Sequence, residues 1–122
     1  MKIWTTYFAN LKNIDLEKIQ PVSICGKPID GWKYPQYKKL APSWSIYSEL
    51  KLYGGTEENY TRRYMGEILG SLDQEVVRKE LEALAEGKDE VVLVCYEKPG
   101  DFCHRHLVAE WLGEDVKEYE SN

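Results

Sequence analysis

The chain has 122 residues, 43% of them hydrophobic and 30% charged, as expected of a single soluble globular domain over residues 1–122. Its net charge is −5, with seven lysines against four acids in residues 1–50 and nine basic against seventeen acidic residues in 51–122, which argues against a duplex-DNA binder. No apolar stretch approaches the roughly 18 residues of a membrane span, and the N-terminus lacks the apolar run of a signal peptide, so we expect a cytoplasmic protein without membrane contact.

The first half of the chain predicts two short strands and then a long irregular segment. β-Branched and aromatic residues alternate over 2–8, which predicts a strand, and the apolar spacing over 14–19 predicts a short helix. Residues 21–25 predict a second strand. The segment at about 26–55 is rich in proline, glycine and aromatic residues, and we expect a functional loop there with one helical turn near 43–52.

Two helices are predicted in the middle of the chain. Thr56 is a suitable N-cap for a helix that continues to Leu69. Ser71 and Gln74 form a capping-box pattern, which predicts a second helix that runs to about Glu86.

The last third of the chain predicts a β-α-β unit. Residues 91–96 are continuously apolar, which is typical of a strand buried on both faces of a parallel sheet. A helix over 102–112 and a last strand over 116–119 follow. The element order predicts an α/β fold, a small and mostly parallel sheet with helices on both faces, and a ligand site at the carboxyl ends of the strands.

A cluster of reactive side chains follows the strand over 91–96. Cys103, His104 and Arg105 fall in the first turn of the predicted helix, where free N–H groups and the helix dipole favour anions, and the Arg105 guanidinium matches phosphate or carboxylate. Cys103 is either a nucleophile or a packed structural residue, and His104 is either an acid–base group or a hydrogen-bonding support. Glu97 is either a proton acceptor or the ion-pair partner of Arg105, and Cys95 is either a buried spectator or a resolving thiol.

The cysteine pattern favours free thiols over a disulfide or a metal site. Three cysteines is an odd number, so we expect reduced thiols. No C-x-x-C pair exists and the strand-to-helix spacing does not match the usual zinc patterns, so we expect neither a metal nor another cofactor. The spacing of Cys95 and Arg105 does not match a tyrosine-phosphatase loop, in which five residues separate the cysteine from the arginine.

An aromatic, basic stretch begins at Trp32 and runs to Lys39. Aromatic rings stack on bases and lysines contact phosphates, so Trp32 and Tyr34 are candidates for base stacking. Trp44 and Tyr47 either extend this surface or pack a satellite core beneath the loop.

The residues around the Cys-His-Arg turn resemble the family called domain of unknown function 488. Its signature is an apolar strand that enters Cys-x-Glu-Lys, then a short break and Cys-His-Arg at a helix start. Here these read Cys95-Tyr96-Glu97-Lys98 and Cys103-His104-Arg105, and the resemblance is good over roughly residues 60–120 and weak over the first half of the chain. Family members typically have Gly-x-Ser after the first strand and Asp-x-Arg after the second, and this chain has neither. Lys27 is the candidate to replace the missing arginine as an anion ligand.

Three functions fit these observations. First, the protein binds a phosphate-bearing nucleotide or a single-stranded nucleic-acid end at the Cys-His-Arg turn, with or without catalysis by Glu97 or His104. Second, it is a non-enzymatic binding module that uses the aromatic, basic loop. Third, it is a thiol-dependent enzyme that uses Cys103. The sequence indicates no particular oligomeric state.

Overall fold

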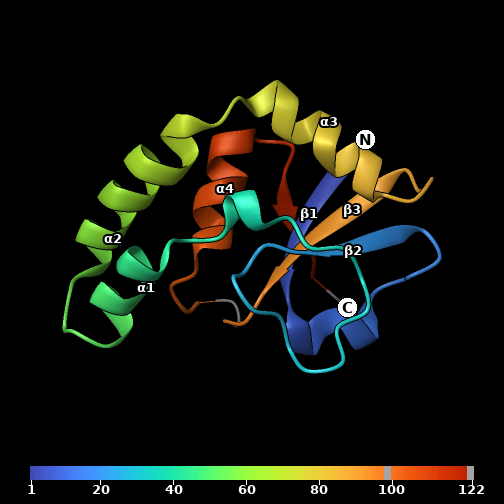
Figure 1. The fold of residues 1–122 in the computed structure, drawn as a ribbon. Helices are drawn as coiled ribbons and strands as arrows, with labels where there is room; N and C mark the ends of the chain where they lie inside the picture. Colours follow the sequence, from blue (N-terminus) through green and yellow to red (C-terminus); the bar gives the residue numbers. More distant parts are fainter. Residues whose placement is uncertain (98–99, 121–122) are drawn as a thin grey trace.

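Four parallel strands form one sheet in the order β2-β3-β1-β4 (Figure 1). The computed structural model describes residues 1–97 and 100–120. Its strands are β1 (Lys2–Tyr7), β2 (Ile19–Ser23), β3 (Glu90–Cys95) and β4 (Lys117–Glu118). The predicted α/β fold is confirmed, and every strand pair within the described residues is parallel.

The central strand β3 positions the site. Residues 91–95 of β3 are all buried because the strand is paired on both sides and covered on both faces, as its continuous apolar run predicted. Tyr7 pairs with Cys95, and Ser23 pairs with Val94. The carboxyl ends of β1, β2 and β3 therefore lie level, and the residues that follow these strands meet at one edge of the sheet.

Helices and short helical turns connect the strands. The α-helices are α1 (Trp44–Lys51), α2 (Glu57–Arg63), α3 (Gln74–Leu84) and α4 (His104–Leu112). The shorter turns are the 3-10 segments η1 (Phe8–Asn13), η2 (Lys38–Leu40) and η4 (Leu69–Ser71), and the π-helical segment η3 (Tyr64–Ile68). The helix predicted over 56–69 thus begins as α2 and widens into a π-helix after Arg63.

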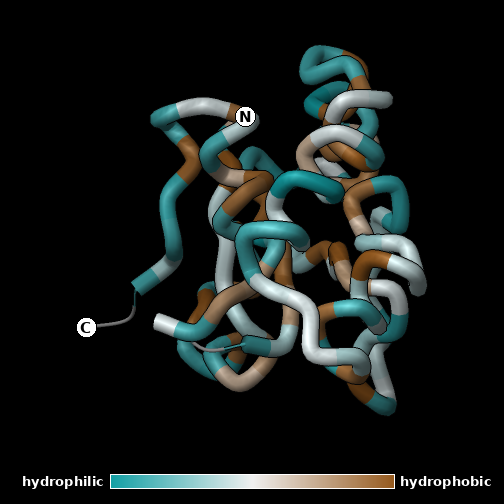
Figure 2. Tube along the Cα trace, turned by 90° about the vertical axis from the view of Figure 1, so that its left-hand side faces the viewer, coloured by the Kyte–Doolittle hydropathy of each residue, from teal (hydrophilic) through white to brown (hydrophobic). Residues whose placement is uncertain are grey.

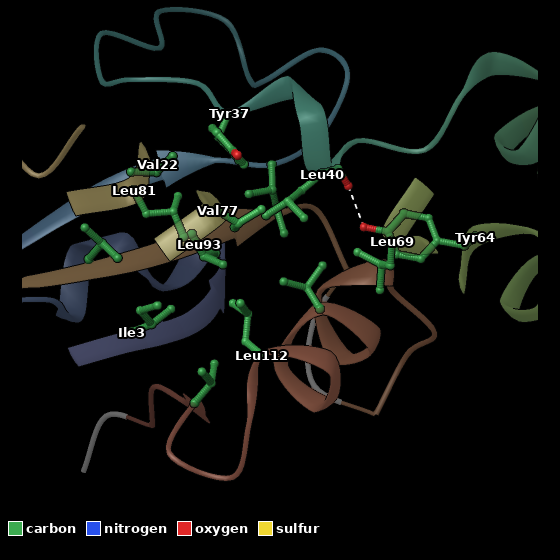
Figure 3. Packing of buried hydrophobic residues seen from close by; sticks show 14 of the residues in the cluster. Ile3, Val22, Tyr37, Leu40, Tyr64, Leu69, Val77, Leu81, Leu93 and Leu112 are labelled. Atoms are coloured by element: carbon green, nitrogen blue, oxygen red, sulfur yellow. Dashed lines mark hydrogen bonds between the residues drawn. The ribbon is translucent and has the colours of Figure 1, made fainter. Parts of the chain in front are cut away.

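Two hydrophobic clusters cover the two faces of the sheet. On one face the α-helices pack on β1, β2 and β3, and Figure 3 shows Val77 and Leu81 of α3 beside Leu93 of β3. The Tyr64 hydroxyl donates a hydrogen bond of 2.6 Å to the Leu40 carbonyl across this cluster. The other face is covered by η1 and the loop around Trp32.

The distribution of hydropathy follows these layers. Hydrophobic stretches run through the middle of the molecule, and many outer turns are hydrophilic (Figure 2). Among the described residues, no helix combines the length and apolar character required to traverse a bilayer.

The helix predicted over 14–19 is wrong. The chain forms η1 earlier, and Asp15 then closes a turn in which its carbonyl accepts from the N–H groups of Lys18 and Ile19. Strand β2 begins at Ile19, two residues before the prediction. Pro21 is tolerated in β2 because β2 is an edge strand, where a missing N–H donor leaves no ladder bond unmade.

The predicted capping box of the helix after Gly70 is also wrong. Asp73 is the N-cap of α3, and its carboxylate accepts from the N–H groups of Glu75 and Val76 at 2.9 and 3.1 Å. The Ser71 hydroxyl instead donates to the Ile68 carbonyl at 2.8 Å. An aspartate at the N-cap stabilises the helix both by hydrogen bonding and by its charge near the positive end of the dipole.

Candidate active site

A cavity of about 610 Å³ opens at the carboxyl edge of the sheet. Aromatic side chains form much of its wall: Trp44, Tyr47, Tyr60, Tyr96 and Phe102. Its ionisable and thiol-bearing side chains are Cys25, Lys27, Lys51, Cys95, Glu97, Cys103 and His104. The volume lies in the range of small-molecule sites, which is about 300–1,000 Å³.

The topology explains why these residues meet. Cys95 is the last residue of β3, and Cys25 follows the level end of the neighbouring strand β2. Cys103 is the N-cap of α4, the helix that returns from β3 toward β4, so His104 opens this helix beside the strand ends. The site at the strand carboxyl ends is the place that an open parallel sheet favours for a ligand.

Cys95 and Cys103 are paired in a disulfide. This corrects the expectation of reduced thiols throughout the chain, because the strand end and the helix start bring the two sulfurs together across eight positions of sequence. Cys25 is the remaining cysteine; it is free and buried, and burial raises its pKa.

His104 is buried and held in one orientation. Its Nε2 lies 2.8 Å from the carbonyl oxygen of Ile24, so Nε2 carries the proton and donates it to that carbonyl. The other ring nitrogen, Nδ1, lies 3.8 Å from Cys103 Sγ. Burial lowers the pKa of His104 to about 4, so the ring is neutral near pH 7 and presents the Nδ1 lone pair toward Cys103 Sγ.

Arg105 lies behind the cavity, with its side chain fully buried. Its Nε and Nη2 atoms donate to the two carboxylate oxygens of Glu118 at 3.1 and 3.0 Å. Its Nη1 donates to Cys95 Sγ at 3.2 Å and to the Glu97 carbonyl. The structure therefore places Arg105 as a brace between α4, β4 and the end of β3, and it is not among the side chains that line the cavity.

The Glu97 carboxylate is not the ion-pair partner of Arg105. It lies 3.5 Å from Lys51 Nζ on α1, and only the Glu97 main-chain carbonyl meets Arg105. The ion-pair partner of Arg105 is Glu118, which the sequence did not indicate. Glu118 also accepts a hydrogen bond of 2.7 Å from the Thr5 hydroxyl. Glu97 does line the cavity, so its candidacy as a proton acceptor stays a prediction.

Of the loop residues predicted to contact a ligand, Lys27 lies at the cavity, whereas Trp32 and Tyr34 do not. Lys27 lines the cavity, and its role as an anion ligand stays a prediction. Its main-chain carbonyl accepts a hydrogen bond from the Tyr96 hydroxyl at 2.7 Å. Trp32 instead packs edge-on against Phe8 and Tyr34, with ring centroids 5.2 and 5.1 Å apart, and its Nε1 donates to the Pro35 carbonyl. Neither Trp32 nor Tyr34 lines the cavity.

The sequence did not predict that the aromatic residues of α1, together with Tyr60 and Phe102, line the cavity. Trp44 and Tyr47 are one helical turn apart on α1, with ring centroids separated by 5.8 Å, and both are exposed at the cavity. The sequence left open whether they pack a core. Tyr60 and Phe102 meet edge to face at 5.0 Å on the buried side of the cavity. Their spacing in sequence, 42 positions, gave no signal that they form one wall.

Three potential metal ligands gather at the inner end of the cavity. The Sγ atoms of Cys95 and Cys103 and a ring nitrogen of His104 all lie within 4.8 Å of one another, and the three residues are buried. The irregular spacing of 95, 103 and 104 gave no zinc pattern, because the ligands come from a strand end and a separate helix start. What this arrangement can do chemically is metal binding or thiol exchange, with access from the cavity.

Comparison with known proteins identifies the family. No curated protein and no solved structure matches the chain. The family model DUF488-N3a, described as the active DUF488-N3 subclade, matches residues 14–116 and so includes most of the first half, where the resemblance in sequence is weak. Its range includes the Cys95 and Cys103-His104-Arg105 signature, of which Lys98 lies outside the described residues. The chain therefore belongs to the DUF488-N3a family, the active DUF488-N3 subclade.

Proposed function

We propose that the protein binds a phosphate-bearing nucleotide, or the phosphorylated end of a single-stranded nucleic acid, in the cavity at the carboxyl edge of the sheet. The observation that carries this proposal is the composition of the cavity, in which exposed aromatic rings and an exposed lysine surround the N-terminus of α4. Such a combination suits a planar base joined to an anion.

Stacking is assigned to α1. Trp44 is 68% exposed although it is a large aromatic residue, and Tyr47 beside it is 40% exposed. Their ring planes are tilted by 33°, so the two rings offer a near-continuous aromatic surface at the cavity. Base–aromatic stacking contributes about 1–3 kcal/mol per base and tolerates any base, which fits a site that recognises nucleotides as a class.

Anion recognition is assigned to Lys27 and to the start of α4. Lys27 is exposed at the cavity and pairs with no carboxylate among the described residues, whereas Lys51 is engaged by Glu97. Helix α4 has nine residues and begins at the cavity with His104, where the partial positive charge of the dipole attracts phosphate. Arg105 supports this helix start from behind.

A second candidate function is thiol chemistry, and one contact favours it. Arg105 Nη1 donates to Cys95 Sγ at 3.2 Å, and a permanently charged donor at this distance stabilises the thiolate once the disulfide is reduced. This contact makes Cys95 the better candidate for a nucleophile, with Cys103 as the resolving thiol, than the reverse order. The binding module built on Trp32 and Tyr34 is less favoured, because both rings pack against other side chains away from the cavity.

Calorimetric titration tests the nucleotide proposal. A nucleoside monophosphate, the matching nucleoside, inorganic phosphate and a 5′-phosphorylated oligonucleotide are titrated separately, so that base and phosphate contributions and the two sources of the phosphate are resolved. Trp44→Ala should weaken binding of the phosphorylated ligand roughly 5- to 150-fold, the equivalent of about 1–3 kcal/mol. Lys27→Ala should weaken binding and reduce its salt dependence.

Matched controls lie close to these residues. Tyr53→Ala removes an aromatic ring that is 77% exposed and outside the cavity wall, and Lys38→Ala removes an exposed charge outside it. Both should leave the affinity unchanged. Binding that is lost equally in Tyr53→Ala and Trp44→Ala, or no binding by any of the four ligands, would contradict the proposal.

A further inference from the structure

We propose that Cys95, Cys103 and His104 form, in the reduced protein, a binding site for a borderline-soft divalent metal ion of the zinc class. The site goes beyond nucleotide binding and does not depend on it. It uses two thiolates and one imidazole, the donor set that such ions prefer over magnesium or calcium.

The three ligand atoms lie close enough together to share one ion once the disulfide is reduced. Zinc lies about 2.3 Å from thiolate sulfur and about 2.0–2.1 Å from imidazole nitrogen, so two ligands in a tetrahedral site are roughly 3.5–4 Å apart. The three ligand atoms lie within 4.8 Å of one another, and Cys103 Sγ is 3.8 Å from His104 Nδ1. Cys95 and Cys103 are joined by a disulfide in this structure, with their Cα atoms 7.6 Å apart, so the two sulfurs can take up an ion between them only after the disulfide has been reduced.

His104 and Cys95 each accept or donate a hydrogen bond of the kind that orients metal ligands in proteins. His104 Nε2 donates to the Ile24 carbonyl at 2.8 Å, which fixes the tautomer whose Nδ1 lone pair faces the two sulfurs. Arg105 Nη1 donates to Cys95 Sγ at 3.2 Å and offsets the negative charge that two thiolates bring to a buried site. Both supporting contacts are therefore in place around a three-ligand set.

The fourth coordination position faces the cavity. All three ligands line the cavity wall, and no fourth protein ligand joins the group within the described residues. Three protein ligands with one open position are the arrangement of zinc sites that bind water or substrate, whereas structural zinc sites are closed by four. A metal bound here would meet whatever ligand the aromatic wall holds.

The metal-bound state and the disulfide exclude each other, because the same two sulfurs form both. A two-electron thiol reductant opens the disulfide: two reductant thiols become one disulfide, and Cys95 and Cys103 each gain a hydrogen. The ion then replaces the thiol protons, which pass to solvent, as Cys95 and Cys103 bind as thiolates. The site is consequently available only to the reduced protein.

The test is titration of the reduced, metal-free protein with zinc, and then with cobalt as a spectroscopic probe, without any nucleotide. We expect one equivalent of zinc, a raised melting temperature, and a thiolate-to-cobalt charge-transfer absorption. The oxidised protein should show none of these. A reduced protein that binds no stoichiometric zinc, or cobalt without a thiolate band, would overturn the proposal.

Variants identify the ligands. Cys95→Ser and Cys103→Ser should abolish the stoichiometric binding, and His104→Gln should weaken it while it retains an N–H donor for the Ile24 carbonyl. Cys25→Ser is the matched control, since Cys25 lies outside the ligand group, and it should retain one equivalent. Loss of zinc in Cys25→Ser, or its retention in Cys103→Ser, would refute this ligand set. Should a ligand variant not fold, the wild-type cobalt spectrum in the reduced and oxidised states decides alone.

Discussion

The buried ion pair between Arg105 and Glu118 gives the sharpest test of how the site is supported. In Arg105→Met the side chain keeps most of its length, but Glu118 loses both of its hydrogen bonds to the guanidinium. The Glu97 carbonyl and Cys95 Sγ lose their donor as well. Removing one partner of a buried pair costs about 3–5 kcal/mol, since the remaining charge stays desolvated. Glu118 is 19% exposed and keeps its bond from Thr5, which places the expected loss near the lower end, at about 3 kcal/mol.

Urea unfolding of the reduced protein measures this loss without the contribution of the disulfide. A loss of about 3 kcal/mol corresponds to a melting temperature about 12 °C lower for a chain of this size. The double variant Arg105→Met, Glu118→Met should recover part of the loss, because no unpaired charge remains. Lys39→Met is the control: its pair with Glu80 is exposed, so it should cost less than about 1 kcal/mol.

Ligand-binding measurements distinguish a structural role of Arg105 from a direct role in anion binding. If Arg105 only braces α4, β4 and the end of β3, the double variant should fold and still bind the nucleotide, with Trp44 and Lys27 intact. The reasoning fails if Arg105→Met loses less than about 1 kcal/mol of stability while binding of inorganic phosphate disappears. That result would make the guanidinium itself the anion ligand.

Two further predictions concern stability. In the metal-free protein, the pKa of His104 is about 4 in the folded state and about 6.5 in the unfolded state, so the unfolded chain takes up the proton first as the pH falls. The free energy of unfolding should therefore be highest above pH 6.5 and decrease by about 3 kcal/mol toward pH 4. In urea unfolding at a series of pH values, His104→Gln should make this decrease smaller. Asp73→Ala should destabilise α3 by about 0.5–2 kcal/mol in thermal unfolding, whereas Ser71→Ala should cost less because Ser71 does not cap the helix; equal losses would contradict the assigned N-cap.

The parts of the fold that the sequence predicted are those in which local pattern and burial agree. The strand predicted over 91–96 was found as β3, displaced by one position to Glu90–Cys95, because only a strand covered on both faces buries the five residues 91–95 in succession. The helix over 102–112 became α4, with its start displaced by two positions. The start of α3 was predicted wrongly because Ser71 and Asp73 are both favourable N-cap residues. In the structure Asp73 is the N-cap.

The sequence predicted those residues of the candidate site that are close together along the chain, and it missed those that only the fold brings together. Cys95, Cys103 and His104 were found because they lie near one another in the sequence. Glu118 was missed as the partner of Arg105, because the two meet only when β4 pairs with β1, and this depends on the order of strands in the sheet. Trp44 could not be assigned from sequence because α1 is only eight residues long, too short for its apolar spacing to show which side chains face out.

The side chains proposed to bind the ligand and the side chains capable of thiol or metal chemistry come from different elements of the fold, although they line the same cavity. The aromatic rings available for stacking come from α1, whereas the thiols and the imidazole come from the end of β3 and the start of α4. Arg105 contacts the second group through Cys95 Sγ. Substitutions on α1 should therefore change which ligand binds without changing the state of the thiols. Oxidation of Cys95 and Cys103 should change the chemistry at the inner end of the cavity and leave the stacking surface in place.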